Sequence, residues 1–187
     1  MVMQMIKPPQ VSTGRWLFYA CHLVLLLIFS NTSFAYECAE HMRSTDMQRF
    51  DDNHDGTLTD IDSGLTWMRC ALGQRWEGNT CLGEPERYTW QSALQAARQL
   101  NQLTGYAEYK DWRVPKVQEL AGIVERHCKN PRINLQLFPT TSATYFWSVN
   151  TKPKTYNQAY VMDFAREGVT TLIKGDRALV RLVRGRQ

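Results

Sequence analysis

The 187-residue sequence lacks the short motifs by which catalytic sites are usually recognised. It contains no Gly-x-Ser-x-Gly nucleophile elbow, no His-Glu-x-x-His zinc motif and no glycine-rich phosphate loop. Histidine is scarce, and its four copies are His22, His41, His54 and His127. We therefore expect that the protein is not an enzyme and that it needs no cofactor, apart from the calcium ion considered below.

Long hydrophobic runs are also absent. The longest apolar stretch, residues 16–29, is shorter than the roughly twenty residues that a helix needs to cross a bilayer. A basic start with Lys7 and Arg15 precedes it, and Ser33-Phe34-Ala35 offers small residues to a signal peptidase. We predict a signal peptide over residues 1–35 and a protein that is periplasmic, cell-surface or secreted. In the alternative, the leader stays uncleaved and is the only attachment to a membrane.

The charge balance does not indicate a nucleic-acid partner. Lys and Arg number 22 and Asp and Glu number 18, so the formal net charge is +4. The predicted leader carries two basic residues and no acidic one, and without it the net charge is +2. No long basic run occurs before the C-terminal end, and we expect no binding to nucleic acid.

Five cysteines occur, and one of them, Cys21, lies in the predicted leader. The other four suggest two disulfides in an exported domain, with three pairings open. Cys70 and Cys81 bracket a short loop that contains Gly and Asn, so we predict a Cys70–Cys81 bridge. Cys38 and Cys128 would then form the second bridge. A zinc site is the rival interpretation, but the spacings match no zinc motif.

Two segments have helical periodicity. Residues 90–103 repeat apolar positions three or four apart, and Gly105 follows as a stop signal. A second helix is expected to begin at Pro115, which suits a first helical position. We expect this helix to reach His127, where an imidazole complements the helix dipole.

The remaining regular segments are strand-like, and residues 36–49 form a polar segment expected on the surface. Short strands, RF and GLTWMRC, flank the polar stretch 51–62, which is expected to be a turn. Four segments rich in branched and aromatic residues follow: residues 144–149, 159–165, 168–173 and 178–185. REG and KGD are expected to be hairpin turns between the last three of these segments. The expected fold class is therefore α+β, with two helices packed on antiparallel strands and disulfides holding the domain.

Five segments together carry a family resemblance. In order they are GTLTDIDSGLTWMRC, YTWQSALQAA, DWRVPKVQEL, INLQLFPTTSATYFWS and ALVRLVRG. This series resembles the C-terminal domain of the collagen-like adhesins, the Lcl C-terminal domain, and we assign residues 50–187 to it. The resemblance implies an exported, lectin-like α+β module, and the founding adhesin of that family binds sulfated glycosaminoglycans. The Gly-x-y collagen stalk of that adhesin is absent from this chain.

The polar stretch DDNHDGTLTDID, residues 51–62, has nearly the pattern of a calcium loop. Asp51, Asn53, Asp55 and Asp62 fall at the first, third, fifth and twelfth places, and Gly56 falls at the sixth. The flanking segments, however, look like strands rather than the helices of an EF-hand. Asn, Asp and Gly also favour tight turns for backbone reasons. We interpret the stretch as a hairpin turn and keep calcium binding as the alternative.

Tryptophans offer candidate contacts of two kinds. Trp112 and Arg113 in DWRVP could stack on a sugar and hold an anion, but a helix entry of this composition usually builds the fold. We therefore expect Trp112 to be buried and Arg113 to pair with backbone carbonyls or a carboxylate such as Glu119. Trp67 and Trp147 lie in apolar strand patterns and are expected in the core.

Four residues remain as candidate ligand contacts. Trp76 lies beside Arg75 in the loop between Cys70 and Cys81, where we expect both to be exposed. Arg177 and Arg181 would share one face of an unbroken strand, and the arginine fork suits sulfate or phosphate. Solvated charge on an antiparallel sheet is the alternative interpretation.

Together these features favour a binding module that recognises a sulfated or other anionic glycan, or an envelope protein. The alternative is a structural or assembly component of an envelope machine, without a small ligand.

Overall fold

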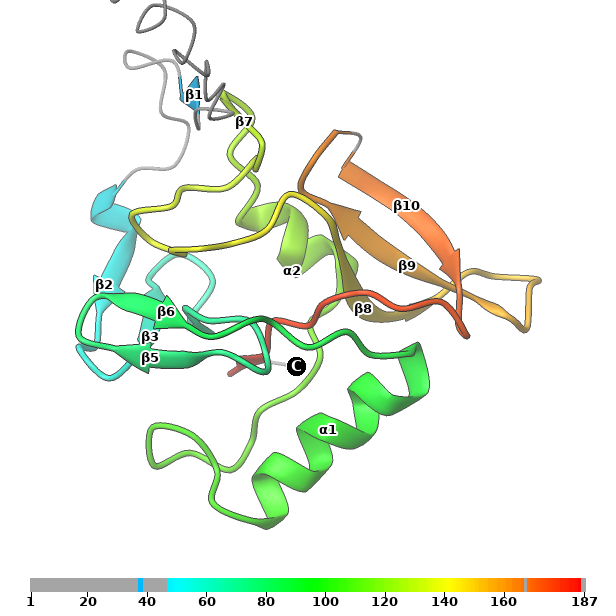
Figure 1. The fold of residues 1–187 in the computed structure, drawn as a ribbon, viewed down its shortest axis with the longest axis horizontal. Coiled ribbons are helices and arrows are strands. Elements are labelled where there is room, and N and C mark those ends of the chain that lie inside the picture. The colour runs from blue at the N-terminus through cyan, green and yellow to red at the C-terminus, as the bar shows by residue number, and fades with distance from the viewer. Residues whose placement is uncertain (1–36, 39–46, 167, 186–187) are drawn as a thin grey trace, which may run out of the picture. The chain divides into compact units, whose positions relative to one another are not determined.

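The computed structural model describes residues 37–38, 47–166 and 168–185 (Figure 1). Its helices are α1 (Trp90–Gln102) and α2 (Val117–Gly122), and a 3-10 turn, η1 (Met47–Arg49), precedes the first sheet. The strands are β1 (Glu37–Cys38), β2 (Phe50–Asp52), β3 (Thr57–Asp60), β4 (Leu65–Met68), β5 (Arg75–Glu77), β6 (Thr80–Leu82), β7 (Cys128–Lys129), β8 (Tyr145–Thr151), β9 (Gln158–Asp163), β10 (Gly168–Ile173) and β11 (Val183–Arg184). The sheets are antiparallel, so the predicted α+β class is confirmed.

The polar stretch 51–62 was expected to be a hairpin turn, but the turn between β2 and β3 takes up only residues 53–56. The stretch also contains β3, which lies between β2 and β4 in a four-stranded sheet of order β11-β4-β3-β2. Leu58 in the middle of β3 is 1% exposed and supplies the core contact that fixes the strand. Because two turns flank β3, the polar side chains are divided between its two ends.

A second sheet has the order β10-β9-β8. The predicted hairpin between residues 159–165 and 168–173 is confirmed, with Gly168 opposite Asp163 and Ile173 opposite Gln158. One face of this sheet packs against α1 through Trp147, Ala159 and Val161. In Figure 1, α1 and the β8–β9–β10 sheet lie side by side, and α2 lies near the same sheet.

Helix α1 agrees with the prediction for residues 90–103. Thr89 caps its N-terminus, because the Thr89 hydroxyl accepts a hydrogen bond from the Ser92 N–H at 3.2 Å. Ala93 and Ala97 are buried on one side, and the helix ends just before Gly105, which has φ of +68°. The sequence signals for this helix are therefore read correctly at both ends.

Helix α2 is shorter than expected and does not reach His127. Lys116 is its N-cap, so Pro115 lies just outside, and the helix ends at Gly122. Glycine and the branched residues that follow it are weak helix formers. The chain then turns back, and Cys128 enters strand β7, which pairs with β1.

The C-terminal segment 178–183 does not continue the β8–β9–β10 sheet as a fourth strand, which corrects the expected run of hairpins. It leaves β10 after the KGD turn and passes between two core clusters. Leu179 and Val183 face one cluster, whereas Ala178, Val180 and Leu182 face the other. Backbone bridges to Tyr88, Phe146 and Arg113 and the pairing of β11 with β4 tie the segment to both halves of the molecule.

The Cys70–Cys81 disulfide is present, as predicted. It spans the hairpin of β5 and β6, where Trp76 is the Cα partner of Cys81. Cys128 is also disulfide-bonded, and the β1–β7 register places Cys38 directly opposite it. The side chain of Cys38 is not among the described atoms, so the Cys38–Cys128 bridge stays a prediction.

The predicted signal peptide, residues 1–35, and most of segment 36–49 lie outside the described residues. Among the residues that are described, no helix is both long enough and apolar enough to cross a bilayer.

Candidate functional site

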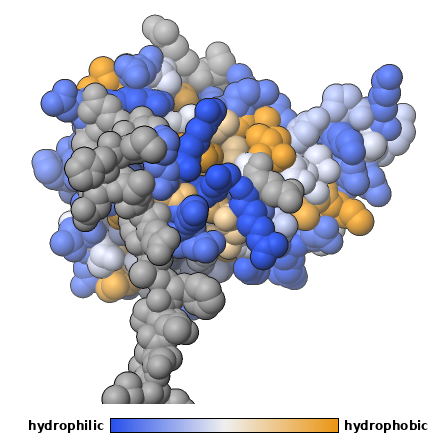
Figure 2. All heavy atoms as spheres, turned by 90° about the horizontal axis from the view of Figure 1, so that it is seen from above, coloured by the Kyte–Doolittle hydropathy of each residue, from blue (hydrophilic) through white to orange (hydrophobic). Residues whose placement is uncertain are grey.

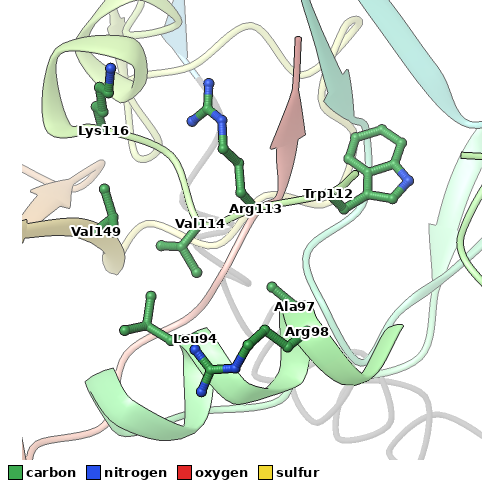
Figure 3. A pocket seen from close by; sticks show the side chains of 8 residues that line it. All are labelled: Leu94, Ala97, Arg98, Trp112, Arg113, Val114, Lys116 and Val149. Atoms are coloured by element: carbon green, nitrogen blue, oxygen red, sulfur yellow. The ribbon is translucent and has the colours of Figure 1, made fainter. Parts of the chain in front are cut away.

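The candidate site is a groove between helix α1 and the chain that leads into α2. It has a volume of about 350 Å³. Figure 3 shows the helix contributing one wall and the segment 112–116 the other, with Val149 of β8 at one end. We call it the α1 groove, and its lining residues are Leu94, Ala97, Arg98, Trp112, Arg113, Val114, Lys116 and Val149.

Side-chain contacts fix the two walls relative to each other. The amide of Asn101 on α1 both accepts from the Trp112 N–H at 3.0 Å and donates to the Trp112 carbonyl at 2.8 Å. Trp112 is 2% exposed, and its indole N–H donates to the Tyr106 carbonyl at 3.0 Å. The structural role expected for Trp112 is therefore confirmed. Val149 is tied in as well, because its N–H donates to the Pro115 carbonyl at 2.8 Å.

Arg113 is held by the carboxylate predicted for it. Its two terminal nitrogens donate to both oxygens of Glu119 at 2.7 and 2.8 Å. Burial alone would raise the pKa of Glu119, but hydrogen bonds from Arg113 and from the Lys116 N–H outweigh burial and lower this pKa below its ordinary value. The pair is ionised at neutral pH, so the charge of Arg113 is offset within the protein.

Arg98 and Lys116 differ from Arg113, because both are exposed and neither forms a salt bridge with a described residue. In Figure 3, Arg98 extends from α1 beside Leu94, and Lys116 stands on the opposite wall at the entry to α2, with its side chain directed away from α1. No lining residue is acidic. The groove thus combines an aliphatic surface with two cations on opposite walls, which suits an anionic ligand.

The contacts predicted from the sequence do not converge on one site. Arg75 is exposed but pairs with Glu77 at 2.5 Å. Trp76 is a strand residue of β5 rather than a loop tip, and the guanidinium of Arg69 lies 4.3 Å from its ring centroid. Trp76 was expected to be exposed in a loop, but it lies in a strand and is half-buried.

Arg181 is not on the surface, which overturns the expected strip of Arg177 and Arg181. It is fully buried and donates to the carbonyls of Met68 and Arg69 and to the Thr141 hydroxyl. Residue 177 lies outside any strand, and Leu179 and Val183, two residues on either side of Arg181, face the core as Arg181 does. Arg177 is exposed and donates to the Arg87 carbonyl at 3.2 Å.

The four residues considered as calcium ligands are spread over β2 and the turns on both sides of β3. Asn53 and Asp55 are in the turn before it, where the Asn53 amide donates to Thr57 at 2.8 Å and Asp55 accepts the Thr57 N–H at 2.9 Å. Asp51 pairs with Thr59 inside the β2–β3 ladder. Asp62 is in the turn after β3, with a carboxylate oxygen 3.5 Å from Arg49. In the described part of the chain no group of three or more His, Cys, Asp or Glu residues could hold a metal ion.

Sequence reasoning did not single out Arg98 or Lys116. A signal was present, since α1 carries Arg98 one turn after Leu94 and contains no acidic residue at all. Lys116 could not be assigned to the same site from the sequence, because only the folded chain brings residue 116 opposite α1.

The described residues thus form a small, disulfide-bonded α+β module that carries a cationic groove. The family model of the Lcl C-terminal domain matches residues 56–184, and the chain belongs to this family. Membership indicates an adhesin-like extracellular module. No curated protein matches the sequence.

Proposed function

We propose that this protein is an exported, lectin-like binding module, not an enzyme, and that it recognises an anionic glycan in the α1 groove. The observation that carries the proposal is the pair of exposed cations, Arg98 and Lys116, on opposite walls of an aliphatic groove without an acidic lining residue. Membership of the Lcl C-terminal domain family supports an extracellular, adhesive role. The Cys70–Cys81 disulfide supports export to an oxidising compartment.

The chemistry of the groove favours a sulfated or carboxylated sugar over a neutral one. Trp112 is 2% exposed, so its ring is not available for stacking on a sugar face. Leu94, Val114 and Val149 instead offer aliphatic contacts to the C–H groups of a pyranose ring. Arg98 can hold a sulfate through two parallel N–H groups, and Lys116 supplies a point charge.

A second hollow serves this role less well. It lies between α2 and the β8–β9–β10 sheet, has a volume of about 430 Å³ and has no charged lining residue. It therefore offers nothing that would select an anion.

The test measures binding of the purified protein to a heparin-derived oligosaccharide and to the same oligosaccharide after desulfation. We expect binding to the sulfated form only, and a loss of affinity as salt rises, because exposed ion pairs are screened. Arg98→Ala and Lys116→Ala should each weaken binding by about tenfold, the equivalent of one charged hydrogen bond. Arg126→Ala is the matched control, because it removes an exposed cation that does not line the groove.

Equal weakening by all three variants would show a general effect of charge and would contradict a role of the groove. Absence of binding to any anionic glycan would favour the alternative, an assembly component of an envelope machine without a small ligand. Melting temperatures of the variants should stay close to that of the wild type, since both side chains are exposed.

A further inference from the structure

Strand β10 is an open edge of its sheet. It pairs with β9 over its whole length, and the described residues place no strand on its other side. Figure 1 shows β10 as the outermost strand of the β8–β9–β10 sheet. Such an edge exposes a row of backbone donors and acceptors that can pair with another chain.

The phase of the ladder shows which groups face outward. The Lys174 N–H donates to the Asn157 carbonyl at 2.7 Å, and residue pairs alternate between hydrogen-bonded and non-hydrogen-bonded along antiparallel strands. Gly168, Thr170 and Leu172 therefore bond to β9, whereas Val169, Thr171 and Ile173 direct their N–H and C=O groups away from it. Asp176 already accepts the Ile173 N–H at 3.1 Å.

Two residues, Val169 and Thr171, thus keep both backbone groups unpaired within the described part of the chain. Natural edge strands are usually protected by charged residues, proline or a bulge. The sequence of β10, GVTTLI, contains no charged residue and no proline, and its register with β9 is unbroken.

Apolar side chains accompany the open backbone. Val169 is 49% exposed and Ile173 is 51% exposed. Figure 2, which views the molecule from above, shows hydrophobic residues exposed among hydrophilic ones on that face. The edge therefore has the two features of a pairing surface, namely free hydrogen-bonding groups and exposed β-forming side chains.

We propose that two copies of this protein pair through β10, antiparallel and with Thr170 on the two-fold axis. Val169 of each copy then lies opposite Thr171 of the other, and these residues exchange their N–H and C=O groups. This register uses the free donors and leaves the Ile173 N–H with Asp176. A register centred on Thr171 would instead pair Val169 with Ile173 and would need the N–H that Asp176 holds.

The side chains also fit this register. Leu172 falls opposite Gly168 of the second copy, where the missing side chain leaves room. The two sheets would join into one continuous sheet across the axis. Each dimer would then carry two α1 grooves. It could therefore attach bivalently to a repetitive ligand although the chain has no collagen stalk.

The expected dimer is weak, because pairing along one short edge buries less than the roughly 1,200 Å² of a stable interface. Sedimentation equilibrium of the mature protein, residues 36–187, over a range from about 10 μM to 1 mM is the appropriate test. We expect a reversible monomer–dimer equilibrium in this range. A wild-type protein that is monomeric throughout would overturn the proposal.

Thr171→Pro tests the edge directly. The Thr171 N–H points away from β9, so proline at this position removes an outward donor without breaking the β9–β10 ladder. We expect dimerisation at least about tenfold weaker, because two symmetric hydrogen bonds are lost. Thr171→Val is the matched control, since it keeps the backbone donor, and its dimerisation should stay within about threefold of the wild type. Equal dimerisation of the proline variant would overturn the proposal.

Hydrogen exchange of the wild type gives a second measurement that does not depend on the folding of a variant. The amides of Val169 and Thr171 should exchange more slowly as protein concentration rises, whereas other amides of the sheet should not change. Protection that is already complete at low concentration would mean that another segment covers the edge, and it would overturn pairing between copies.

Discussion

At the scale of single residues, Gly56 explains why the calcium-like pattern places a glycine at its sixth position. Its φ is +89°, a conformation that side chains rarely adopt. A Cβ at this position would also lie 2.7 Å from Cγ of Trp76 and would collide with the Tyr106 hydroxyl. The glycine therefore serves both the turn and the packing of two aromatic rings against it.

Gly56→Ala should destabilise the protein by about 2–4 kcal/mol, since it combines strain at positive φ with overpacking. Gly64→Ala is the control, because Gly64 has φ of +68° but no atom within 4 Å of the added Cβ. That variant should lose only about 1 kcal/mol. Urea unfolding of both variants measures the difference, and equal losses would show that the aromatic contact contributes nothing.

The Arg113–Glu119 pair predicts a dependence of stability on acid. The folded state lowers the pKa of Glu119. The ionised carboxylate therefore stabilises the fold at any pH above the ordinary glutamate pKa of 4.5. This contribution is lost as the pH falls through the lowered pKa. Glu119→Gln should therefore reduce the free energy of unfolding by about 1–2 kcal/mol at pH 7, and the deficit should shrink as the pH falls below 4.5.

Thermal unfolding between pH 3 and pH 7 measures this effect. Glu77→Gln is the matched control, because Glu77 forms an exposed pair with Arg75 and should contribute less than about 0.5 kcal/mol. A deficit of Glu119→Gln that is the same at both ends of the pH range would contradict the electrostatic explanation.

Arg181 shows how a charged residue can be part of the core. Burial lowers its pKa to about 9, so the guanidinium remains protonated at neutral pH. Carbonyl oxygens of Met68 and Arg69 and the hydroxyl of Thr141 accept its hydrogen bonds, and the ring of Phe138 lies 4.8 Å from it. Its donors thus tie the C-terminal segment to the end of β4 and to Thr141.

At the scale of elements, local signals predicted those parts of the fold that local interactions determine. Helix α1 has an apolar repeat, a threonine cap and a glycine stop, and it was placed almost to the residue. The β9–β10 hairpin was found from its turn. The predicted length of helix α2 was too great. The apolar residues after Gly122 indicated a longer helix, but Ile123 is buried in a turn.

Segments stabilised by distant partners were harder to predict. Strand β3 lies in a polar sequence, and its partners on both sides are needed to hold it. Residues 178–183 alternate like a strand, but both of their sides are buried between separate clusters. A sequence with alternating polarity does not show whether the charged side meets water, and Arg181 was misplaced for this reason.

The β2–β3–β4 segment carries a prediction about calcium. Asp55 already accepts hydrogen bonds from Thr57, and Asp62 lies at the opposite end of β3. We expect the melting temperature to stay unchanged as calcium is added to about 1 mM, well above the affinity of most sensor sites. Asp51→Asn and Asp55→Asn should each change stability by no more than about 0.5 kcal/mol, because asparagine keeps an acceptor oxygen. A rise of several degrees that magnesium does not reproduce would show calcium binding instead.

At the scale of the whole molecule, the α1 groove exists only because distant segments meet. Asn101 joins α1 to Trp112, and Glu119 fixes Arg113 on the second wall. The structural roles of Trp112 and Arg113 were predicted correctly from the sequence, and Arg98 and Lys116 are the exposed cations of the groove. Trp112 and Arg113, which build the groove, and Lys116, which we propose as a ligand contact, thus lie within one short stretch of chain.

The cysteines make a final prediction about the whole chain. The Cys70–Cys81 bridge closes a sequence separation of 11, and a Cys38–Cys128 bridge would close a far longer loop. In the loop-entropy model the two contribute about 3 and about 5 kcal/mol, so the long bridge matters more for stability. The register of β1 and β7 supports it, since Cys38 and Cys128 are Cα partners and Cys128 is disulfide-bonded. Peptide mapping without reduction should yield one peptide that joins Cys70 to Cys81 and another that joins Cys38 to Cys128. A peptide that joins Cys38 to Cys70 would contradict this pairing and would separate the N-terminal strand from β7.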